Sequence, residues 1–257
     1  SVGWDGNIAF TQQIGQVSLQ LRGNFTYQKT DILDMDEAAN ELWYKMNKGF
    51  QLNQSRGFIA LGLFKDQEDI DRSPSQASLA NKTILPGDIK YKDVNGDGVI
   101  DSYDKVVGVG HPNVPEIVYG FGLNIEYKGF YASVFFQGTG NCSVLLGGNT
   151  PEGWYPFAWG VDQSSYRTFA LDRWTESNPS QNVLMPRLHK DNANNANNQV
   201  ASTWWLRNGG FLRLKNMEFG YQLPKQILLC GMTLSISIRK QEMQMEETYT
   251  LRIVPLP

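Results

Sequence analysis

Cysteine and histidine are nearly absent from this chain of 257 residues, which carries two of each. Two cysteines do not build the disulfide framework of a small secreted domain, and whether Cys142 pairs with Cys230 is left open by the sequence. The cysteines and histidines also lack the spacing of a zinc site. His111 precedes a proline and His189 lies in a polar stretch, so we predict a structural role for both.

Charge of one sign and long hydrophobic runs are lacking too. The net charge of −3 provides no basic face for nucleic acid, and 41% hydrophobic residues is too many for a disordered chain. No apolar run approaches the length of a membrane helix, although this does not exclude strands that span a bilayer. Phosphate-binding loops and serine elbows are missing as well, so the sequence does not predict an enzyme.

The sequence does contain long stretches in which apolar and polar residues alternate. Val17–Lys29 keeps a period of two over thirteen residues, about twice the usual strand length in a soluble sheet. A strand of this length fits a tilted crossing of a bilayer, and a long strand in a soluble sandwich or barrel is the alternative. Its predicted apolar face carries Val17, Leu19, Leu21, Phe25 and Tyr27.

A hairpin is predicted from the same alternation further along the chain. Ile117–Tyr127 and Phe130–Gln137 flank the short turn Lys128-Gly129, and each has one apolar face. Tyr119, Phe121 and Leu123 fall on that face of the first strand. Further predicted strands are Trp4–Gln12, Phe211–Leu223 with a bulge between Leu214 and Met217, and Met232–Ile238. Gln241–Pro257 matches no pattern well.

Two long connections interrupt the strands, after Lys29 and after Gln137. Helical spacing predicts short helices within Asp34–Asn47, with Asp36 as N-cap and Gly49 as stop, and within Asp162–Thr175. The polar run Asp191–Gln199 is predicted to be a mobile loop tip. The aromatic cluster of the second connection either stacks on sugars or packs against its own loop; it includes Trp154, Tyr155 and Trp159.

An acidic loop, D-V-N-G-D-G-V-I-D-S-Y-D, has the ligand spacing of an EF-hand. Gly98 allows the sharp turn, and four carboxylates repel one another unless a cation lies among them. We therefore predict Ca²⁺ here, with a metal-free Asn-Gly/Asp-Gly turn as the alternative, because the last position is Asp rather than Glu and the flanks are not helical. The predicted ligands are Asp93, Asn95, Asp97, Asp101, Asp104 and the carbonyl of Val99.

Short turns near Gly15, Lys128 and Pro224 and long connections after Lys29 and Gln137 fall at opposite strand ends. This arrangement is typical of an outer-membrane β-barrel. The alternative is a soluble extracellular β-module with a calcium-binding loop that binds glycans. The two differ in whether the apolar faces point outward as one band or inward to a core.

Several stretches also resemble the SusC/RagA-type TonB-dependent outer-membrane transporters of Bacteroidetes. The most specific are P-G-D-I-K-Y-K-D-V-N-G-D-G-V-I-D (Pro86–Asp101) and W-L-R-N-G-G-F-L-R-L-K-N-M-E-F-G-Y-Q-L-P (Trp205–Pro224). Y-G-F-G-L (Tyr119–Leu123), S-V-F-F-Q-G (Ser133–Gly138) and G-N-F-T-Y-Q-K-T-D-I-L-D-M-D-E (Gly23–Glu37) agree. The resemblance covers about residues 1–228.

The resemblance implies an all-β fold: an antiparallel transmembrane segment of a plugged barrel of roughly 22 strands, with long extracellular loops that carry short helices. Residues 1–257 are then expected to be the C-terminal portion of the barrel, without the plug. Residues 229–257 depart from the family pattern, as a truncation or a shift of reading frame would produce. The implied function is import of oligosaccharides or peptides across the bacterial outer membrane. The implied partners are a SusD-like surface lipoprotein and TonB, the latter through the missing plug region.

Overall fold

The computed structural model describes residues 1–38, 42–80, 83–146, 168–189, 192–222, 232–238 and 249–255. The chain divides into two compact units. The first, which we call the sheet unit, comprises Ser1–Lys29, Pro115–Cys142 and Gly209–Pro257. The second, the loop unit, comprises the two long connections, Thr30–Val114 and Ser143–Asn208.

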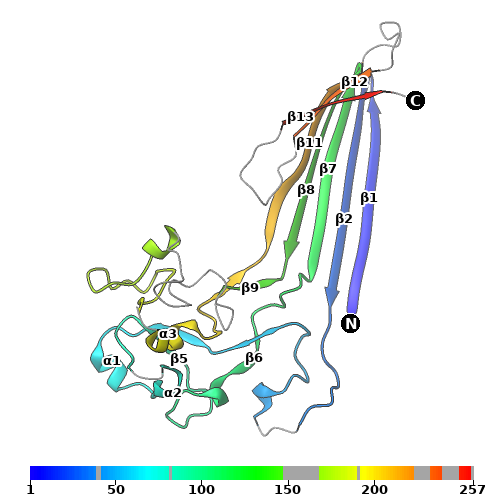
Figure 1. The fold of residues 1–257 in the computed structure, drawn as a ribbon. Coiled ribbons are helices and arrows are strands. Elements are labelled where there is room, and N and C mark those ends of the chain that lie inside the picture. Colours follow the sequence, from blue (N-terminus) through cyan, green and yellow to red (C-terminus); the bar gives the residue numbers. More distant parts are fainter. Residues whose placement is uncertain are drawn as a thin grey trace. The chain divides into compact units, whose positions relative to one another are not determined.

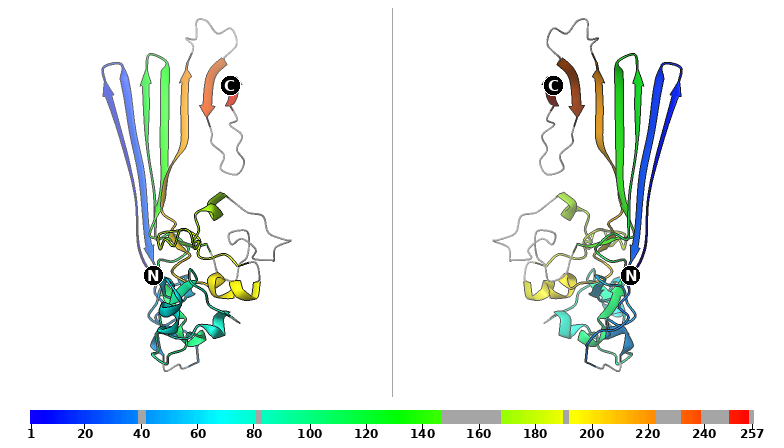
Figure 2. Two further views of the ribbon diagram at one scale, coloured as in Figure 1. Left: turned by 90° about the vertical axis from the view of Figure 1, so that its left-hand side faces the viewer. Right: turned by 90° about the vertical axis from the view of Figure 1, so that its right-hand side faces the viewer.

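The sheet unit is one antiparallel sheet of seven strands in the order β1-β2-β7-β8-β11-β12-β13. Strands that are adjacent in this sheet also follow one another along the chain, if the strands within the two long connections are left out. Figures 1 and 2 show these strands side by side in a single layer. Their bounds are β1 Val2–Ile14, β2 Val17–Lys29, β7 Ile117–Tyr127, β8 Phe130–Gly140, β11 Phe211–Tyr221, β12 Met232–Ile238 and β13 Tyr249–Pro255.

Tight turns join the paired strands because the turn residues accept a left-handed backbone. Lys128 and Gly129 both have positive φ, 48° and 87°, which is the geometry that matches the twist of a two-residue hairpin. Gly15, with φ of 61°, turns β1 into β2. The register of β11 against β8 shifts between Leu214 and Asn216, so the predicted bulge is confirmed.

Most predicted strands are confirmed, although several bounds differ: β8 runs to Gly140 rather than Gln137, and β11 ends at Tyr221 rather than Leu223. β1 extends from Val2 to Ile14 and pairs with β2 along its whole length, so it is longer than the predicted Trp4–Gln12. The last segment, for which the sequence predicted no element, contains β13, paired with β12. The hydrogen bonds to β12 form β13, although the sequence pattern of this segment is too weak to predict a strand.

The loop unit is built from short elements around its own core. Its buried hydrophobic side chains include Phe58, Tyr91, Trp174 and Trp205. The elements are β3 Ser55–Gly57, β4 Ala60–Leu63, β5 Ile89–Tyr91, β6 Val106–Val109, β9 Ser143–Leu145, β10 Leu206–Asn208, α1 Gln67–Asp71, α2 Ala77–Ala80 and α3 Asn192–Gln199, with 3-10 turns Trp43–Lys45, Ser102–Asp104 and Thr168–Leu171.

Asparagine side chains of α3 complete the hydrogen bonding of β5, which pairs with β4 on one side only. Asn198 Oδ1 accepts from the Ile89 N–H at 2.9 Å, and Asn197 Nδ2 donates to the Ile89 carbonyl at 3.0 Å. Both asparagines are fully buried. The prediction of a mobile loop tip at Asp191–Gln199 is therefore wrong, because these polar residues satisfy a buried strand edge.

Neither of the two helices predicted from helical spacing is confirmed among the described residues. Within Asp34–Asn47 the described residues hold only the 3-10 turn Trp43–Lys45, and Asp36 caps no helix. Within Asp162–Thr175 the described part, from residue 168, begins with the 3-10 turn Thr168–Leu171. In the part of the chain that the structure describes, no helix has the length and hydropathy to cross a membrane.

We expect Asn198→Ala to lower the free energy of unfolding of the loop unit by about 2–4 kcal/mol, because it leaves the Ile89 N–H and an Asp88 oxygen without this partner in a buried site. Asn182→Ala, at an exposed position, is the matched control and should change little. Denaturant titration together with hydrogen exchange at the Ile89 amide measures both. Equal stability of the two variants would contradict the role given to Asn198.

Candidate functional site

One face of the sheet unit is apolar across its strands. The register aligns Leu21 of β2 with Leu123 of β7, and Leu123 with Val134 of β8. Val134 in turn lies opposite Met217 of β11. The rows above and below this one are also apolar across these strands; they carry Leu19, Ile125, Ala132 and Phe219 on one side, and Gly23, Phe121, Phe136 and Leu214 on the other.

These apolar side chains are exposed rather than packed in a core. Leu21, Phe25 and Phe121 each keep 45–47% of their surface accessible, and Leu19, Tyr119 and Leu123 are half-buried by their neighbours in the sheet. The described residues of the sheet unit form this one sheet, without a second layer. An outward band agrees with the predicted barrel wall, whereas the soluble-module alternative required an inward core.

The opposite face is polar, and its side chains bond to one another. Asn124 donates to Gln20 Oε1 at 2.8 Å and accepts from Ser133 Oγ at 2.7 Å. The Tyr131 hydroxyl donates to Glu218 at 3.2 Å. Polar ladders of this kind keep their hydrogen-bonding groups satisfied and are suited to contact with water.

Aromatic rings on the polar face lie over glycines of the adjacent strand. A Cβ atom on Gly120 or Gly122 would come within 2.7 Å of the Phe135 ring. The Arg22 guanidinium stacks on the same ring, 5.0 Å from its centroid. Gly120 and Gly122 therefore make room for the Phe135 ring, and this ring in turn holds the charged Arg22 side chain on the polar face.

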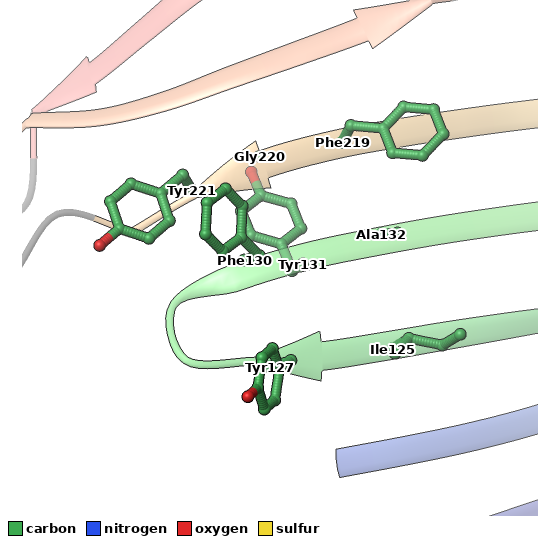
Figure 3. A pocket seen from close by; sticks show the side chains of 8 residues that line it. All are labelled: Ile125, Tyr127, Phe130, Tyr131, Ala132, Phe219, Gly220 and Tyr221. Carbon is green, nitrogen blue, oxygen red and sulfur yellow. The ribbon is translucent and has the colours of Figure 1, made fainter. Parts of the chain in front are cut away.

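An apolar hollow of about 390 Å³ lies at the short-turn end of the sheet (Figure 3). The small side chain of Ala132 leaves space between Ile125 and Phe219. Phe130 and Tyr221 close its end with rings 4.3 Å apart. Aromatic side chains at a strand end match the interfacial girdle of a membrane sheet, where a ring meets both hydrocarbon and water.

The long connections leave and re-enter the sheet at its other end. β2 ends at Lys29 next to the start of β7, where Gln28 donates to the Glu116 carbonyl. β8 ends at Gly140, near the start of β11 at Phe211. The predicted separation of short turns and long connections to opposite strand ends is therefore seen in the sheet itself.

The acidic loop is folded on its own backbone. Asp93 accepts from the N–H groups of Gly96 and Gly98, at 2.6 and 2.9 Å. Asp104 is fully buried and accepts from Val94 and Asp101. Among the described residues, no group of three or more Asp, Glu, His or Cys side chains is arranged to hold a metal ion. In this arrangement the carboxylates serve as turn acceptors, and calcium stays a prediction.

The remaining predicted positions differ in outcome. Trp154, Tyr155 and Trp159 lie outside the described residues, as does Cys230. Cys142 is buried with a free thiol. His189, which the sequence placed in a polar loop, is buried against Asp88, with 2.6 Å between Nε2 and Oδ1. This pair agrees with the structural role predicted for His189, although the side chain is buried rather than exposed in a polar loop.

Sequence reasoning missed Tyr44, which lies next to the acidic loop. Its neighbour Lys45 donates to the Ser102 carbonyl at 3.0 Å and stacks over the Tyr103 ring. Burial, followed by the charges of Asp104 and the other loop carboxylates, raises the pKa of Tyr44. Nothing in the local sequence signalled this contact, because 49 to 60 residues separate Tyr44 from the loop.

Known proteins resemble this chain in sequence. TonB-dependent receptor P26 of Formosa agariphila is 32% identical over 170 residues, which cover 65% of this chain and 15% of the receptor. TonB-dependent receptor P3 of the same organism is 24% identical over 206 residues, covering 80% of the chain and 17% of the receptor. No family model matches the chain.

The fold resembles a solved transporter. The structure of the RagAB peptide transporter superposes with a TM-score of 0.64 at 17% identity, covering 93% of this chain and 24% of that chain. A second structure, of the RagAB peptide importer in its open-open state, gives 0.61 at 18% identity. At these identities the superposition establishes the fold alone.

The fold class is thus mostly antiparallel β-sheet and matches part of a β-barrel transporter. The resemblance to SusC/RagA-type TonB-dependent transporters is confirmed: curated relatives are TonB-dependent receptors, and the structural neighbours are RagAB. The chain spans between 15% and 24% of the length of the relatives it matches. These relatives are receptors and transporters, which fits the prediction that the chain is not an enzyme.

Asp104→Asn tests how the loop is held. The amide offers one acceptor oxygen in place of two, so we expect faster hydrogen exchange at the Val94 and Asp101 N–H groups, by about tenfold for a loss of about 1.4 kcal/mol. Asp71→Asn, an exposed acid of the same unit, controls for the lost charge. Unchanged exchange at both amides would show that Asp104 does not hold the loop.

Proposed function

We propose that this chain forms part of the wall of a TonB-dependent transporter in the bacterial outer membrane, one that imports oligosaccharides or peptides. The single observation that carries the proposal is the two-faced sheet, apolar and exposed on one side and polar on the other. A sheet with this alternation separates hydrocarbon from a wet lumen. Sequence similarity to TonB-dependent receptors supports the same role.

Strand length supports a membrane crossing. β7, β8 and β11 have 11 residues each, and β1 and β2 have 13. At about 3.3 Å per residue, an 11-residue strand is about 36 Å long. A tilt of about 40° leaves a height of about 28 Å, close to the apolar band of about 25 Å on outer-membrane barrels.

The edges of the sheet call for further strands. β1 pairs with β2 on one side, and β13 pairs with β12. In hydrocarbon, each backbone N–H or C=O without a partner costs several kcal/mol, so a membrane sheet closes into a barrel. We propose that strands of a larger barrel, of roughly 22 strands, complete these edges.

The proposed partners follow from the resemblance. A SusD-like lipoprotein would meet the long connections on the outer side, and TonB would act through the plug region that the resemblance implies. Oligosaccharide or peptide is the proposed cargo, and a solved structure with a similar fold is described as a peptide transporter. The aromatics Trp154, Tyr155 and Trp159 remain proposed cargo contacts.

Leu123→Arg and Asn124→Arg test the wall directly, because the two residues are adjacent in β7 and lie on opposite faces. Arginine on the lipid face near the bilayer midplane costs about 2–4 kcal/mol, while the lumen face accepts charge. We expect Leu123→Arg to reduce the folded protein recovered in outer-membrane fractions by about 30-fold or more, and Asn124→Arg to leave it nearly unchanged.

The soluble-module alternative gives the opposite pattern. A protein of that kind remains in solution without detergent, and Leu123 faces its core, so Leu123→Arg lowers its stability in solution rather than its recovery from the membrane. Recovery of the unmodified chain as a monodisperse species in detergent-free buffer would contradict the membrane wall, and equal recovery of both arginine variants from outer-membrane fractions would contradict it as well.

A further inference from the structure

Two hollows of different character adjoin each other at the short-turn end of the sheet unit. The first, which we call the apolar hollow, is the space of about 390 Å³ between β7, β8 and β11 (Figure 3). The second, the polar hollow, measures about 360 Å³ and includes Glu126 and Lys128. Tyr127, Phe130 and Tyr131 line both hollows. A ligand that fills the two together is therefore apolar at one end and polar at the other.

The apolar hollow exists because one small side chain lies between larger ones. Ala132 of β8 lies opposite Ile125 of β7 on one side and Phe219 of β11 on the other. Ile125 keeps 37% of its surface accessible and Phe219 keeps 51%, so the hollow is open on the apolar face. The walls of an unfilled hollow lack dispersion contacts on one side, and an apolar chain that lies there supplies them.

The polar hollow is lined by two charged side chains of opposite sign. Glu126 lies next to the end of β7, and Lys128 lies in the turn, with its Nζ 5.3 Å from the centroid of the Tyr127 ring. Both are exposed, and no ion pair within the described ranges includes either of them. One cation and one anion at the same hollow match a head group that carries a phosphate and an ammonium group.

The position of the apolar hollow within the sheet favours a lipid chain over a peptide. β7, β8 and β11 each pair with a strand on both sides, so an added peptide strand finds no free edge here. A hydrocarbon chain needs no hydrogen bonds, and van der Waals packing alone holds it. Hydrocarbon is also what the apolar face meets in the proposed membrane wall.

We propose that the two hollows bind one phospholipid whose head carries a phosphate and an ammonium group. One acyl chain lies in the apolar hollow over Ala132, the phosphate lies against Lys128 and the ammonium group against Glu126. This inference rests on the proposed function, because a membrane lipid reaches the apolar hollow only if the apolar face meets a bilayer. The rings of Tyr127, Phe130 and Tyr221 then lie where the acyl chain joins the head.

Filling the apolar hollow is the first test. The protein is purified from outer-membrane fractions in detergent and titrated with dioleoylphosphatidylethanolamine, and native mass spectrometry counts the bound lipid. We expect one lipid on the parent chain, and about tenfold weaker binding to Ala132→Phe, the effect of losing the packing of about two methylene groups. Val134→Phe enlarges a side chain of the same strand and face outside the hollow, and should bind as the parent does.

The head-group contacts are tested separately. Lys128→Asn removes the charge and suits the φ of 48° at this turn position. We expect it to weaken phosphatidylethanolamine binding by about fivefold, the contribution of one lysine at a lipid surface, and Lys128→Arg to restore it. Dioleoylglycerol has the same chains without a charged head and should bind the parent and Lys128→Asn equally.

Glu126 decides between head groups. Dioleoylphosphatidylglycerol carries the phosphate without an ammonium group, so the parent should prefer phosphatidylethanolamine and Glu126→Gln should lose this preference. Equal binding of the two phospholipids to the parent would contradict the role given to Glu126.

Photolabelling locates the bound chain. With a diazirine in one acyl chain of phosphatidylethanolamine, we expect label within Ile125–Ala132 and Phe219–Tyr221, and loss of that label in Ala132→Phe. Label spread evenly over the apolar face, or equal occupancy of the parent and Ala132→Phe, would overturn the proposal. Protein absent from outer-membrane fractions contradicts the proposed function as well, whereas protein recovered there without a bound lipid contradicts this inference alone.

Discussion

The two-residue period of side chains along a strand is the constraint on which the sheet unit depends. The strands are antiparallel neighbours in one sheet, and across β2, β7, β8 and β11 the apolar residues of the central rows lie opposite one another on the same face. A slip of one residue would place Leu123 among the polar ladder and Asn124 in the apolar band. The bulge at Lys215 restores this phase in β11, where the pattern would otherwise be lost.

The loop unit solves a different problem with polar side chains. Its strands are three or four residues long, too short to satisfy their edges by pairing alone. Asn197, Asn198 and Gln76 therefore bond to the backbone of β5, and the Trp205 indole donates to the Asn198 carbonyl at 2.8 Å. The two asparagine contacts to Ile89 join segments more than a hundred residues apart and help to give the long connections a core of their own.

Local periodicity predicted the strands well because burial on one face leaves a direct mark on the sequence. Ile117–Tyr127 and Met232–Ile238 are found as predicted. The helices were predicted less well: Leu42 and Trp43 belong to a predicted helical spacing, yet the described residues there hold only a 3-10 turn, and Glu37 accepts from the backbone of Asn47 and Lys48. Spacing of apolar residues does not fix a helix where long-range contacts bind the same backbone.

The sequence by itself determined the alternation, the tight turns and the acidic spacing, because each of these depends on residues that are close in the chain. Only the tertiary structure decided that the polar run before Gln199 forms a helix in which Asn197 and Asn198 are buried, and that Tyr44 lies beside the acidic loop. The reason is physical: a buried amide or hydroxyl is stabilised by a partner that lies far away in sequence, and no local pattern carries that information. The same holds for His189, whose aspartate partner lies 101 residues away.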